Sequence, residues 1–489
     1  MSKNDVKIKK LVLRILLISL TFLLSLVILF SSFCSLSIYK FANAIIIGNQ
    51  NLYGKTYVNA GFCINWFTPF EELAKAFRNK KYIILLQNNY EIRASGGFMG
   101  SYAILNFGSS GLEDWKVENI YVPDGQLKGH VAPILPIQQA FRTGDWRLRD
   151  SNWEIDFPKA ASDIQWFFDK GGEKNIDGII AINFGLIQKL IGILGSIHII
   201  DFNETVDSRN IYTFTQTYSE NNSFPGSTQK QSFLNSLGTN LIEKTLHSNI
   251  FTKVKITTMI YQELNHGQIY VWIADYKLEQ KIYDVGWDGS LPTYNFDFLY
   301  PVESNLGANK ANCCINRSII HQVNIDKNKA KSQVSLLWKN NSEYPEPTPP
   351  SFWGGNYKNY ERIVIPKAAS NILVIVNSKN YTEEKQNDIL NSPKVENDFS
   401  FSVETYENFK IIGFWILVPA TSSTQAIMSY ELPLKHGQKT YEIKVKNQPG
   451  IYELPYKLML NDKIIVMKSI IKEEIFKKNF DSLPNLRLF

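Results

Sequence analysis

The chain has 489 residues, of which 44% are apolar and 20% are charged, a composition that excludes a disordered chain and allows two or three domains. The formal net charge is +6, but residues 1–14 hold five basic residues and one acid, so the remaining 475 residues carry only +2. No basic stripe of the kind that neutralises a phosphate backbone follows, and we therefore expect no nucleic-acid partner.

The N-terminal region predicts a membrane anchor. Residues 15–33 contain no charge, and about 20 apolar residues cross the hydrocarbon core as a helix. The basic residues before them favour a cytoplasmic N-terminus, which places the bulk of the chain outside a single-pass cell membrane protein. The alternative is a signal peptide cleaved after Ala44, but the apolar run exceeds the usual core of ~7–15 residues. We predict a basic tail over 1–14 and an uncleaved transmembrane helix over 15–36.

The four cysteines do not form the dense pattern of a disulfide scaffold. Backbone geometry resists a bond between the adjacent Cys313 and Cys314. A bond from Cys63 to either of them stays open, and free, buried thiols are the simpler expectation for all four, Cys34 included.

The elements that follow predict an α/β domain. A helical stalk over 37–80 includes a helix that begins at Thr68-Pro69 and runs to about Asn79. Next come strands at 82–86, 102–107 and 117–122, an irregular Pro-rich stretch at 130–137, and a helix at 157–168. A strand at 176–182, a helix at 184–194 closed by Gly195, and a strand at 197–200 have the order of a βαβ unit. A polar loop over 203–228 and a helix over 231–246 complete the domain, which we place at 81–310.

The apolar period changes to two after about residue 268. Short strand-like runs separated by turn residues indicate an all-β sandwich, which we place at 311–470 before a C-terminal tail at 471–489. The runs lie at 269–273, 319–325, 333–338, 361–366, 372–377, 411–418, 424–430, 440–446 and 464–468.

The loop between the first two strands is the leading candidate site. Residues 87–102 are longer than a plain strand connection needs, and they hold Asn88, Asn89, Glu91 and Arg93 beside the pair Gly96-Gly97. An arginine beside glycine amides suits an anion or phosphate. The alternative is an ion pair that pins a tight glycine turn.

A second polar cluster precedes the helix at 157–168. Asp156 is positioned to cap that helix, whereas Arg149, Asp150 and Asn152 have no such structural role. Carboxylate and amide oxygens suit Mg²⁺ or Ca²⁺, and arginine suits an anionic ligand. The alternative is a surface loop with local ion pairs.

Three further features have weaker signals. Asp177 and Asn183 flank the strand at 176–182 and would face a cleft or serve turn chemistry. The aromatic, glycine-rich stretch 352–360 would stack on sugar rings or fold over the sandwich core. No Ser–His–Asp order, P-loop or HExxH occurs, so a conventional hydrolase or ATPase is poorly supported.

These stretches, in this order, resemble a bacterial family known as domain of unknown function 4012. The resemblance covers roughly residues 75–460, with Ala94-Ser95 and Asn183 where the family usually has Pro-Thr and Asp. The matching motifs are YIILLQNNYEIRASGGFMGSY from Tyr82, WRLRDSNWEIDFP from Trp146, IDGIIAIN from Ile176, SNLGANK from Ser304, YERIVIP from Tyr360 and QPG from Gln448.

Residues 176–199 also look like part of the LytR–CpsA–Psr fold. That resemblance implies a membrane-anchored external α/β domain that transfers glycopolymer from a polyprenyl-pyrophosphate carrier to the cell wall. It implies that Arg93 and Arg149 hold the pyrophosphate while Asp150, with Glu91, holds Mg²⁺. Asn88, Asn89, Gly96, Gly97, Asn152 and Asp177 would complete the ligand site.

The sequence therefore leaves two hypotheses. One is a membrane-anchored glycopolymer transferase with polyprenyl-pyrophosphate-linked glycan and peptidoglycan as partners. The other is a non-catalytic envelope protein that binds glycans or a protein partner.

Overall fold

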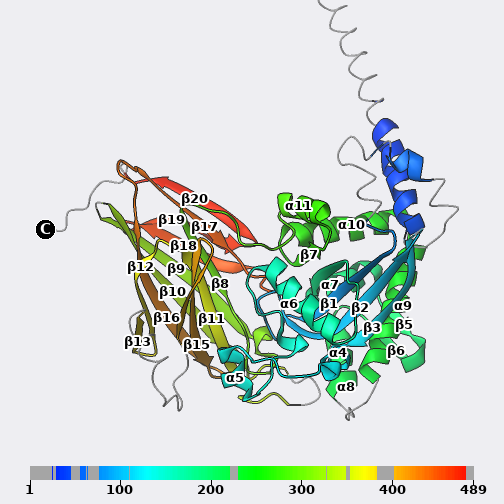
Figure 1. Cartoon of the computed structure of the whole chain (residues 1–489), viewed down its shortest axis with the longest axis horizontal. Helices are drawn as coiled ribbons and strands as arrows, with labels where there is room; N and C mark the ends of the chain where they lie inside the picture. The colour runs from blue at the N-terminus through cyan, green and yellow to red at the C-terminus, as the bar shows by residue number, and fades with distance from the viewer. Residues whose placement is uncertain are drawn as a thin grey trace, which may run out of the picture. The chain divides into compact units, whose positions relative to one another are not determined.

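The computed structural model describes residues 25, 29–45, 56–61, 63, 76–109, 111–220, 229–326, 328–348, 353–382 and 401–480. The chain divides into two compact units, of which the first comprises residues 1–82 and 105–115 and the second comprises 83–104 and 116–489. Figure 1 shows the chain coloured from its N-terminus to its C-terminus.

The first unit holds the helical part of the N-terminal region. Residues 29–45 are helical, and the buried side chains of Phe41, Ala44, Ile45 and Ala60 form its small core. Most of the predicted transmembrane segment at 15–36 and residues 68–75 of the predicted helix from Thr68 lie outside the described residues. The last residues of that predicted helix, 76–79, form a turn instead. Among the residues that are described, no helix has both the length and the apolar character needed to cross a membrane.

All four cysteines are in disulfides, which corrects the expectation of free thiols. Cys34 pairs with Cys63 across a Cα–Cα distance of 5.3 Å, within the range that disulfides normally span. Cys313 pairs with its neighbour Cys314. Cys63 therefore bonds neither member of the adjacent pair.

A five-stranded sheet in the order β3-β2-β1-β4-β7 forms the centre of the α/β part. Its strands are β1 (Lys80–Asn88), β2 (Phe98–Gly108), β3 (Gly111–Asn119), β4 (Gly178–Asn183) and β7 (Ile269–Ile273). β4 and β7 are antiparallel. The run at 269–273, expected in the sandwich, is thus an edge strand of this sheet.

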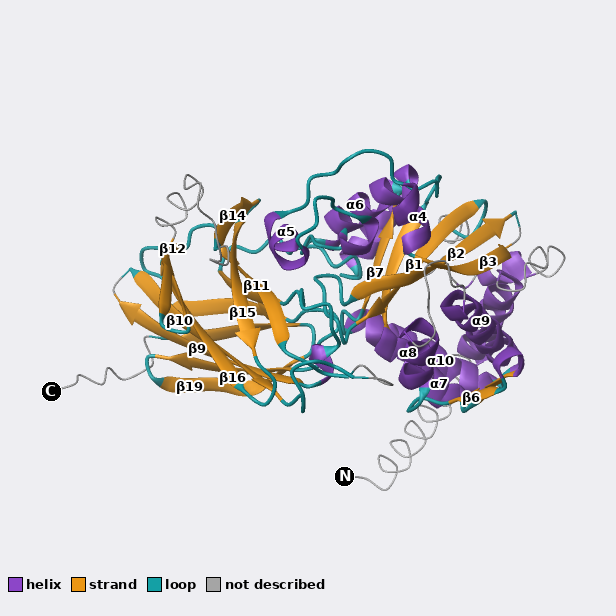
Figure 2. Cartoon of the chain, turned by 90° about the horizontal axis from the view of Figure 1, so that it is seen from below, coloured by secondary structure: helices purple, strands orange, loops and turns teal. Residues whose placement is uncertain are grey.

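Helices cover both faces of this sheet (Figure 2). On one face, α4 (Tyr121–Gln126) and α6 (Phe157–Lys170) pack on alternate residues of β4, Ile179 and Ala181. On the other face, α7 (Phe184–Leu194) and α10 (Ile250–Asn265) pack near Ile180 and Ile182. Because successive strand residues point to opposite faces, the continuous apolar run of β4 reflects burial on both sides.

Several local predictions differ from the structure. The residues predicted as a βαβ unit do not form one, because the three-residue β5 (Ile197–Ile199) leaves the main sheet and pairs antiparallel with β6 (Glu204–Val206). The predicted loop at 203–228 contains β6 and α8 (Ile211–Glu220). The predicted irregular stretch holds the start of α5 (Leu135–Phe141), with Pro136 in its first turn, where proline costs no hydrogen bond. The predicted strand at 117–122 ends at Asn119.

The predicted helices at 157–168, 184–194 and 231–246 correspond to α6, α7 and α9 (Gln229–His247). The short helices are η1 (Leu148–Asp150), η2 (Ile200–Phe202), η3 (Ala311–Cys313) and α11 (Tyr276–Asp284).

Two sheets face each other in the C-terminal part. The first has the order β13-β12-β16-β10-β9-β18-β19 and the second the order β14-β15-β11-β8-β17-β20. A single apolar cluster, including Trp338, Tyr357 and Phe414, fills the space between them. The strands are β8 (Asp297–Val302), β9 (Ile315–Asp326), β10 (Lys329–Asn340), β11 (Tyr357–Pro366), β12 (Ser370–Val376), β13 (Lys379–Thr382), β14 (Ser402–Tyr406), β15 (Phe409–Val418), β16 (Ser423–Pro433), β17 (Thr440–Lys446), β18 (Leu454–Leu460), β19 (Lys463–Ile470) and β20 (Glu473–Asn479).

The sandwich extends beyond both predicted boundaries. β8 comes from the range predicted for the α/β domain and lies between β11 and β17, while β20 comes from the predicted tail. β8 is buried along its whole length and shows no apolar alternation, which explains why a period-two pattern misses it.

The sandwich core contains a buried acid. Asp297 accepts hydrogen bonds from the hydroxyls of Tyr430, at 3.0 Å, and Tyr441. Burial raises the pKa of Asp297 to about 7. Nearby, burial lowers the pKa of His321 to about 3, and His321 Nδ1 lies 3.0 Å from the Tyr456 hydroxyl.

Candidate functional site

Both glycines of the loop Gln87–Tyr102 occupy positions that exclude a side chain. Gly96 has φ +129°, and a Cβ there would lie 2.3 Å from Asn183 Oδ1. A Cβ on Gly97 would lie 2.4 Å from the backbone carbonyl of Asn88. Both glycines, predicted as ligand residues, are thus required by the packing of the loop on itself and on the end of β4.

The Arg93 guanidinium is buried and bonded within the protein. Its Nη2 lies 3.1 Å from Glu91 Oε1 and 3.8 Å from Asp150 Oδ1. Its Nη1 donates to the carbonyl of Ile92, at 3.2 Å, and to the carbonyl of Asn305. With 2% of its surface exposed, Arg93 has its donors directed at internal acceptors.

Arg149 extends the same network toward solvent. Its Nη1 donates to Asp124 Oδ2 at 2.8 Å, and its Nε lies 3.6 Å from Asp150 Oδ2. The guanidinium also lies over the Tyr121 ring, 5.4 Å from the centroid. The Arg149 side chain keeps 32% of its surface exposed. Asp150 therefore joins the two predicted arginines, one buried and one open to solvent.

Burial raises the pKa values of Glu91, Asp150 and Asp124. Arg93 opposes that effect at Glu91 and Asp150, and Arg149 opposes it at Asp124. The acids and bases thus compensate each other in a poorly solvated volume, as buried charges must.

This charge arrangement does not fit the predicted Mg²⁺ site. Glu91 and Asp150 both face the Arg93 guanidinium, whose positive charge lies where it would repel a cation. Over the described residues, no group of three or more His, Cys, Asp or Glu side chains has the arrangement of a metal site.

Side-chain amides from the loop Gln87–Tyr102 and from the polar cluster before α6 form a buried hydrogen-bond network. Ser95 Oγ accepts hydrogen bonds from Gln87 Nε2, at 2.6 Å, and from Asn152 Nδ2, at 2.9 Å. Asn152 also donates to the Gly97 carbonyl at 2.9 Å. Asn152 is fully buried and links the second polar cluster to the glycine turn.

The remaining predicted residues have different surroundings. Asn88 Oδ1 accepts from the Tyr90 amide at 3.1 Å, and the buried Asn89 Oδ1 has no hydrogen-bond partner. Asp177 precedes β4 at the end opposite Asn183, roughly 20 Å away by the rise of a strand, so it does not join the cluster. Asp156 precedes α6 without capping it, because its Oδ2 accepts from the Leu291 amide and the Tyr406 hydroxyl.

The loop fastens the α/β part to the sandwich. Gln448 Nε2 donates to the carbonyls of Arg93 and Glu303, both at 2.8 Å. The Asn305 amide donates to the Ile92 carbonyl at 2.9 Å. Arg362 donates to the Trp153 carbonyl at 2.8 Å. We call these contacts, together with Glu91, Arg93 and Asp150, the polar junction.

Four aromatic side chains form a cluster beside the polar junction. Tyr90, Tyr212 and Trp353 meet edge to face, with centroid distances of 4.7 Å for Tyr90–Trp353, 4.5 Å for Tyr212–Trp353 and 5.3 Å for Tyr90–Tyr212. Phe184 lies 6.1 Å from Tyr90 and 6.0 Å from Tyr212. Trp353 keeps 41% of its surface exposed. We call these four residues the aromatic cluster.

Sequence reasoning identified only part of this cluster. It singled out the stretch 352–360, in which Tyr357 and Tyr360 are buried core residues and Trp353 is exposed. It missed Tyr90, Phe184 and Tyr212, which come from three separate segments. A usable signal was Tyr90 itself, an aromatic residue within an otherwise polar loop.

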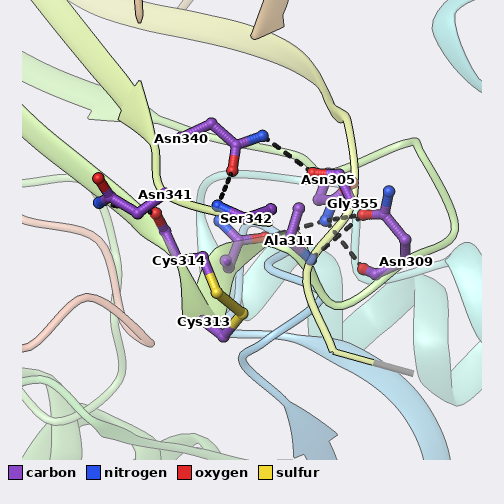
Figure 3. The surroundings of a disulfide bond; sticks show 10 residues. Asn305, Asn309, Ala311, Cys313, Cys314, Asn340, Asn341, Ser342 and Gly355 are labelled. Carbon is purple, nitrogen blue, oxygen red and sulfur yellow. Dashed lines mark hydrogen bonds between the residues drawn. A yellow bond between two sulfur atoms is a disulfide. The ribbon is translucent and has the colours of Figure 1, made fainter. Parts of the chain in front are cut away.

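Asparagine side chains surround the Cys313–Cys314 disulfide (Figure 3). The backbone of this asparagine-rich turn contacts two members of the aromatic cluster. The Asn312 amide donates to the Tyr90 carbonyl at 3.1 Å, and Lys310 forms backbone bridges with Trp353 and Gly354. Asn309 donates to the Asn356 carbonyl, and Asn340 donates to that of Gly355. The turn therefore ties the loop of Tyr90 to the segment of Trp353.

These features define a mixed α/β protein with several sheets, a buried polar junction and an aromatic cluster in which Trp353 is exposed. Residues 78–218 match the family described as "Protein of unknown function (DUF4012)". No curated protein matches the chain.

Two solved structures resemble parts of the chain. One is a candidate nutrient-binding protein from Legionella pneumophila, with 8% identity over 29% of this chain and 50% of that chain, at a TM-score of 0.19. The other is the Lin1025 protein from Listeria innocua, with 10% identity over 45% of this chain and 86% of that chain, at a TM-score of 0.23. The chain thus spans half the length of the Legionella protein, and similarity this low carries no argument about function.

Proposed function

We propose that this protein is a non-catalytic, membrane-anchored envelope protein that binds glycans outside the cell through the aromatic cluster. The exposed Trp353 ring carries the proposal, because sugar rings stack their apolar faces on exposed aromatic side chains. Tyr90 and Tyr212 both pack edge to face against the indole, so ligand binding would restrict a side chain that is already held in place.

Polar groups beside the rings support a sugar as the ligand. The Tyr90 hydroxyl lies 3.5 Å from Gln188 Oε1, and Gln188 Nε2 donates to the Ser208 carbonyl. Binding sites combine apolar walls with a small number of polar groups that fix ligand orientation. Here Tyr90 supplies both an aromatic ring and a hydroxyl.

The cysteines support the external location. Both pairs are disulfides, and disulfides persist mainly in oxidising compartments such as the cell surface. The basic tail and the uncharged run over 15–33 favour the same topology. Cys34 directly follows that run, at the expected outer edge of the membrane.

The surroundings of Arg93 support binding rather than transfer. A pyrophosphate-binding arginine needs donors that are available to the ligand, whereas Arg93 directs its guanidinium at Glu91, Asp150 and backbone carbonyls. The loop that resembles a phosphate cradle is therefore better explained as part of the polar junction.

The test is a pull-down of the purified full chain with peptidoglycan and other envelope glycans. We expect Trp353→Ala to lower affinity about ten-fold or more, in line with the loss of a central aromatic contact. Trp166→Ala is the matched control, because Trp166 on α6 is 44% exposed and lies outside the cluster. Failure to bind any envelope glycan, or equal binding by both variants, would overturn the proposal.

Arg149 favours a second candidate, transfer of glycopolymer from a polyprenyl-pyrophosphate carrier as in the LytR–CpsA–Psr proteins. Its guanidinium is partly exposed and next to Asp150, so it has surface available to a pyrophosphate. Incubation of the full chain with a polyprenyl-pyrophosphate glycan and Mg²⁺ tests this candidate. Turnover that disappears in Arg149→Ala would favour transfer over binding.

A further inference from the structure

Helix α10 (Ile250–Asn265) packs one face into the α/β part. Ile256 and Met259 are members of its apolar clusters. The buried Glu263 forms an ion pair with Lys189, with 2.7 Å between Oε1 and Nζ. At the start of the helix, Asn249 Oδ1 accepts from the Thr252 amide at 2.9 Å. The helix is therefore capped and anchored on its inner side.

The opposite face of α10 is apolar and exposed. Ile250, Val254 and Tyr261 are 48%, 56% and 57% exposed and share one side of the helix, since positions i, i+4 and i+11 are neighbours on its surface. Phe251 lies next to this row and is 77% exposed. We call these four residues the α10 row. Four neighbouring large apolar side chains in solvent indicate an interaction surface.

The charges of α10 complement an anionic surface. Lys253 and Lys255 lie on the two sides of the row by helical position, and Glu263, the one acid of the helix, is buried. Helices that lie on membranes combine an apolar face with flanking lysines, whose long side chains reach the headgroups. Protein interfaces, in contrast, are depleted in lysine.

We propose that the α10 row inserts into the outer leaflet of the cell membrane, with Lys253 and Lys255 beside anionic lipid headgroups. This inference rests on the membrane anchoring in the proposed function, since a segment crossing the bilayer over 15–33 keeps the body of the protein near its surface. It adds a second membrane contact, which would restrict how the body tilts on its anchor.

Photocrosslinking of the full chain in vesicles tests the inference. A benzophenone amino acid replaces Phe251, and the matched control carries it at Met467 in β19, where the exposed fraction is 76%. In vesicles of phosphatidylcholine and phosphatidylglycerol, we expect lipid adducts about ten-fold more abundant at position 251 than at 467. Lys255→Glu should lower the yield at 251 about five-fold.

The outcomes separate this inference from the proposed function. If the chain stays in the vesicles and position 251 yields no more lipid adduct than position 467, the α10 row does not insert and the inference is wrong. An adduct from 251 to another protein would also overturn it in favour of a protein interface. If the chain does not stay in the vesicles, the protein has no membrane anchor and the inference is wrong. Glycan binding is measured in a separate experiment and does not depend on this outcome.

Discussion

Tyr90 and Arg93 lie three residues apart on one loop, and their side chains have opposite surroundings. Arg93 is 2% exposed and joins Glu91, Asp150 and the backbone of the sandwich. Tyr90 is half-buried and supports the exposed Trp353. The polar residues of the loop thus maintain the structure, while an aromatic residue among them contributes to the surface that we propose for binding. A charged loop is therefore not by itself evidence of a ligand site.

Removal of Arg93 is expected to have the largest effect. Arg93→Ala leaves Glu91 and Asp150 buried without their compensating charge, and losing one partner of a buried ion pair costs about 3–5 kcal/mol. Denaturant unfolding of the full chain measures the change in unfolding free energy. Glycan affinity of the folded fraction should stay the same, because the aromatic cluster is intact.

Arg149→Ala is the matched control for Arg93→Ala. The Arg149 side chain is one third exposed while its partner Asp124 is buried, so we expect a smaller cost than for Arg93→Ala, about 1–3 kcal/mol. Equal destabilisation by the two substitutions would contradict the contrast between the buried and the open arginine.

The pH dependence of stability tests whether the buried carboxyl group of Asp297 in the sandwich core contributes to stability. Asp297 has a pKa of about 7 in the folded chain, above the ordinary value of 3.8. The folded state therefore holds this proton more tightly than the unfolded state does. The resulting contribution to the unfolding free energy is fully present below about pH 4 and is lost as the pH rises through 7. The loss is at most about 4 kcal/mol. Unfolding at pH 5 and pH 8 should reveal a loss at pH 8.

Asp297→Asn isolates the contribution of this group. The amide oxygen can still accept from Tyr430 or Tyr441 but does not titrate, so the variant should lose less stability between pH 5 and pH 8 than the wild type. An unchanged pH profile in the variant would assign the dependence to other buried acids, such as Glu361, whose pKa is also raised by burial.

Gly97→Ala tests the packing of the glycine turn. The added Cβ would lie 2.4 Å from the Asn88 carbonyl group, and the displacement of backbone should cost about 1–3 kcal/mol. Gly125→Ala is the control, since a Cβ there meets nothing within 4 Å. The two thermal unfolding midpoints give the comparison. A ligand role for Gly97 would instead lower affinity and leave the midpoint unchanged.

Replacement of the adjacent cysteines should have the smallest effect on stability. Cys313→Ser with Cys314→Ser opens the shortest possible disulfide loop, which costs about 1 kcal/mol in the chain-entropy account. Because the turn ties Tyr90 to the Trp353 segment, we expect glycan affinity to fall more than stability does. Titration calorimetry and denaturant unfolding separate the two. Unchanged affinity would mean that the hydrogen bonds of the turn suffice to position the cluster.

Regular, strongly patterned elements were predicted well. The amphipathic stripes of α6, α7 and α9 are visible along the chain, and so is the period-two alternation of strands such as β10 and β16. β8 was missed because it is buried on all sides, and β5 was misassigned because three residues cannot specify which strand they will pair with.

The sequence indicated that several candidate site residues lie close together, and their roles toward a ligand remain predictions. Arg93, Arg149 and Asp150 lie in one ion-pair network, and Asn152 bonds Ser95 and Gly97 of the same glycine loop. Their partners Asn305 and Gln448 lie more than 200 residues away in the sequence, and sequence spacing gives no means of pairing them with Arg93.

The sequence by itself determined helices α6, α7 and α9, most strands and the near-neutral charge of the body, because propensity, periodicity and composition are local properties. Only the tertiary structure decided which polar residues are consumed by internal partners and which aromatic residue stays exposed. The physical reason is that burial and ion pairing depend on neighbours that are distant in the chain. An arginine beside solvent has donors available to a ligand, whereas the donors of Arg93 face two carboxylates and backbone carbonyls.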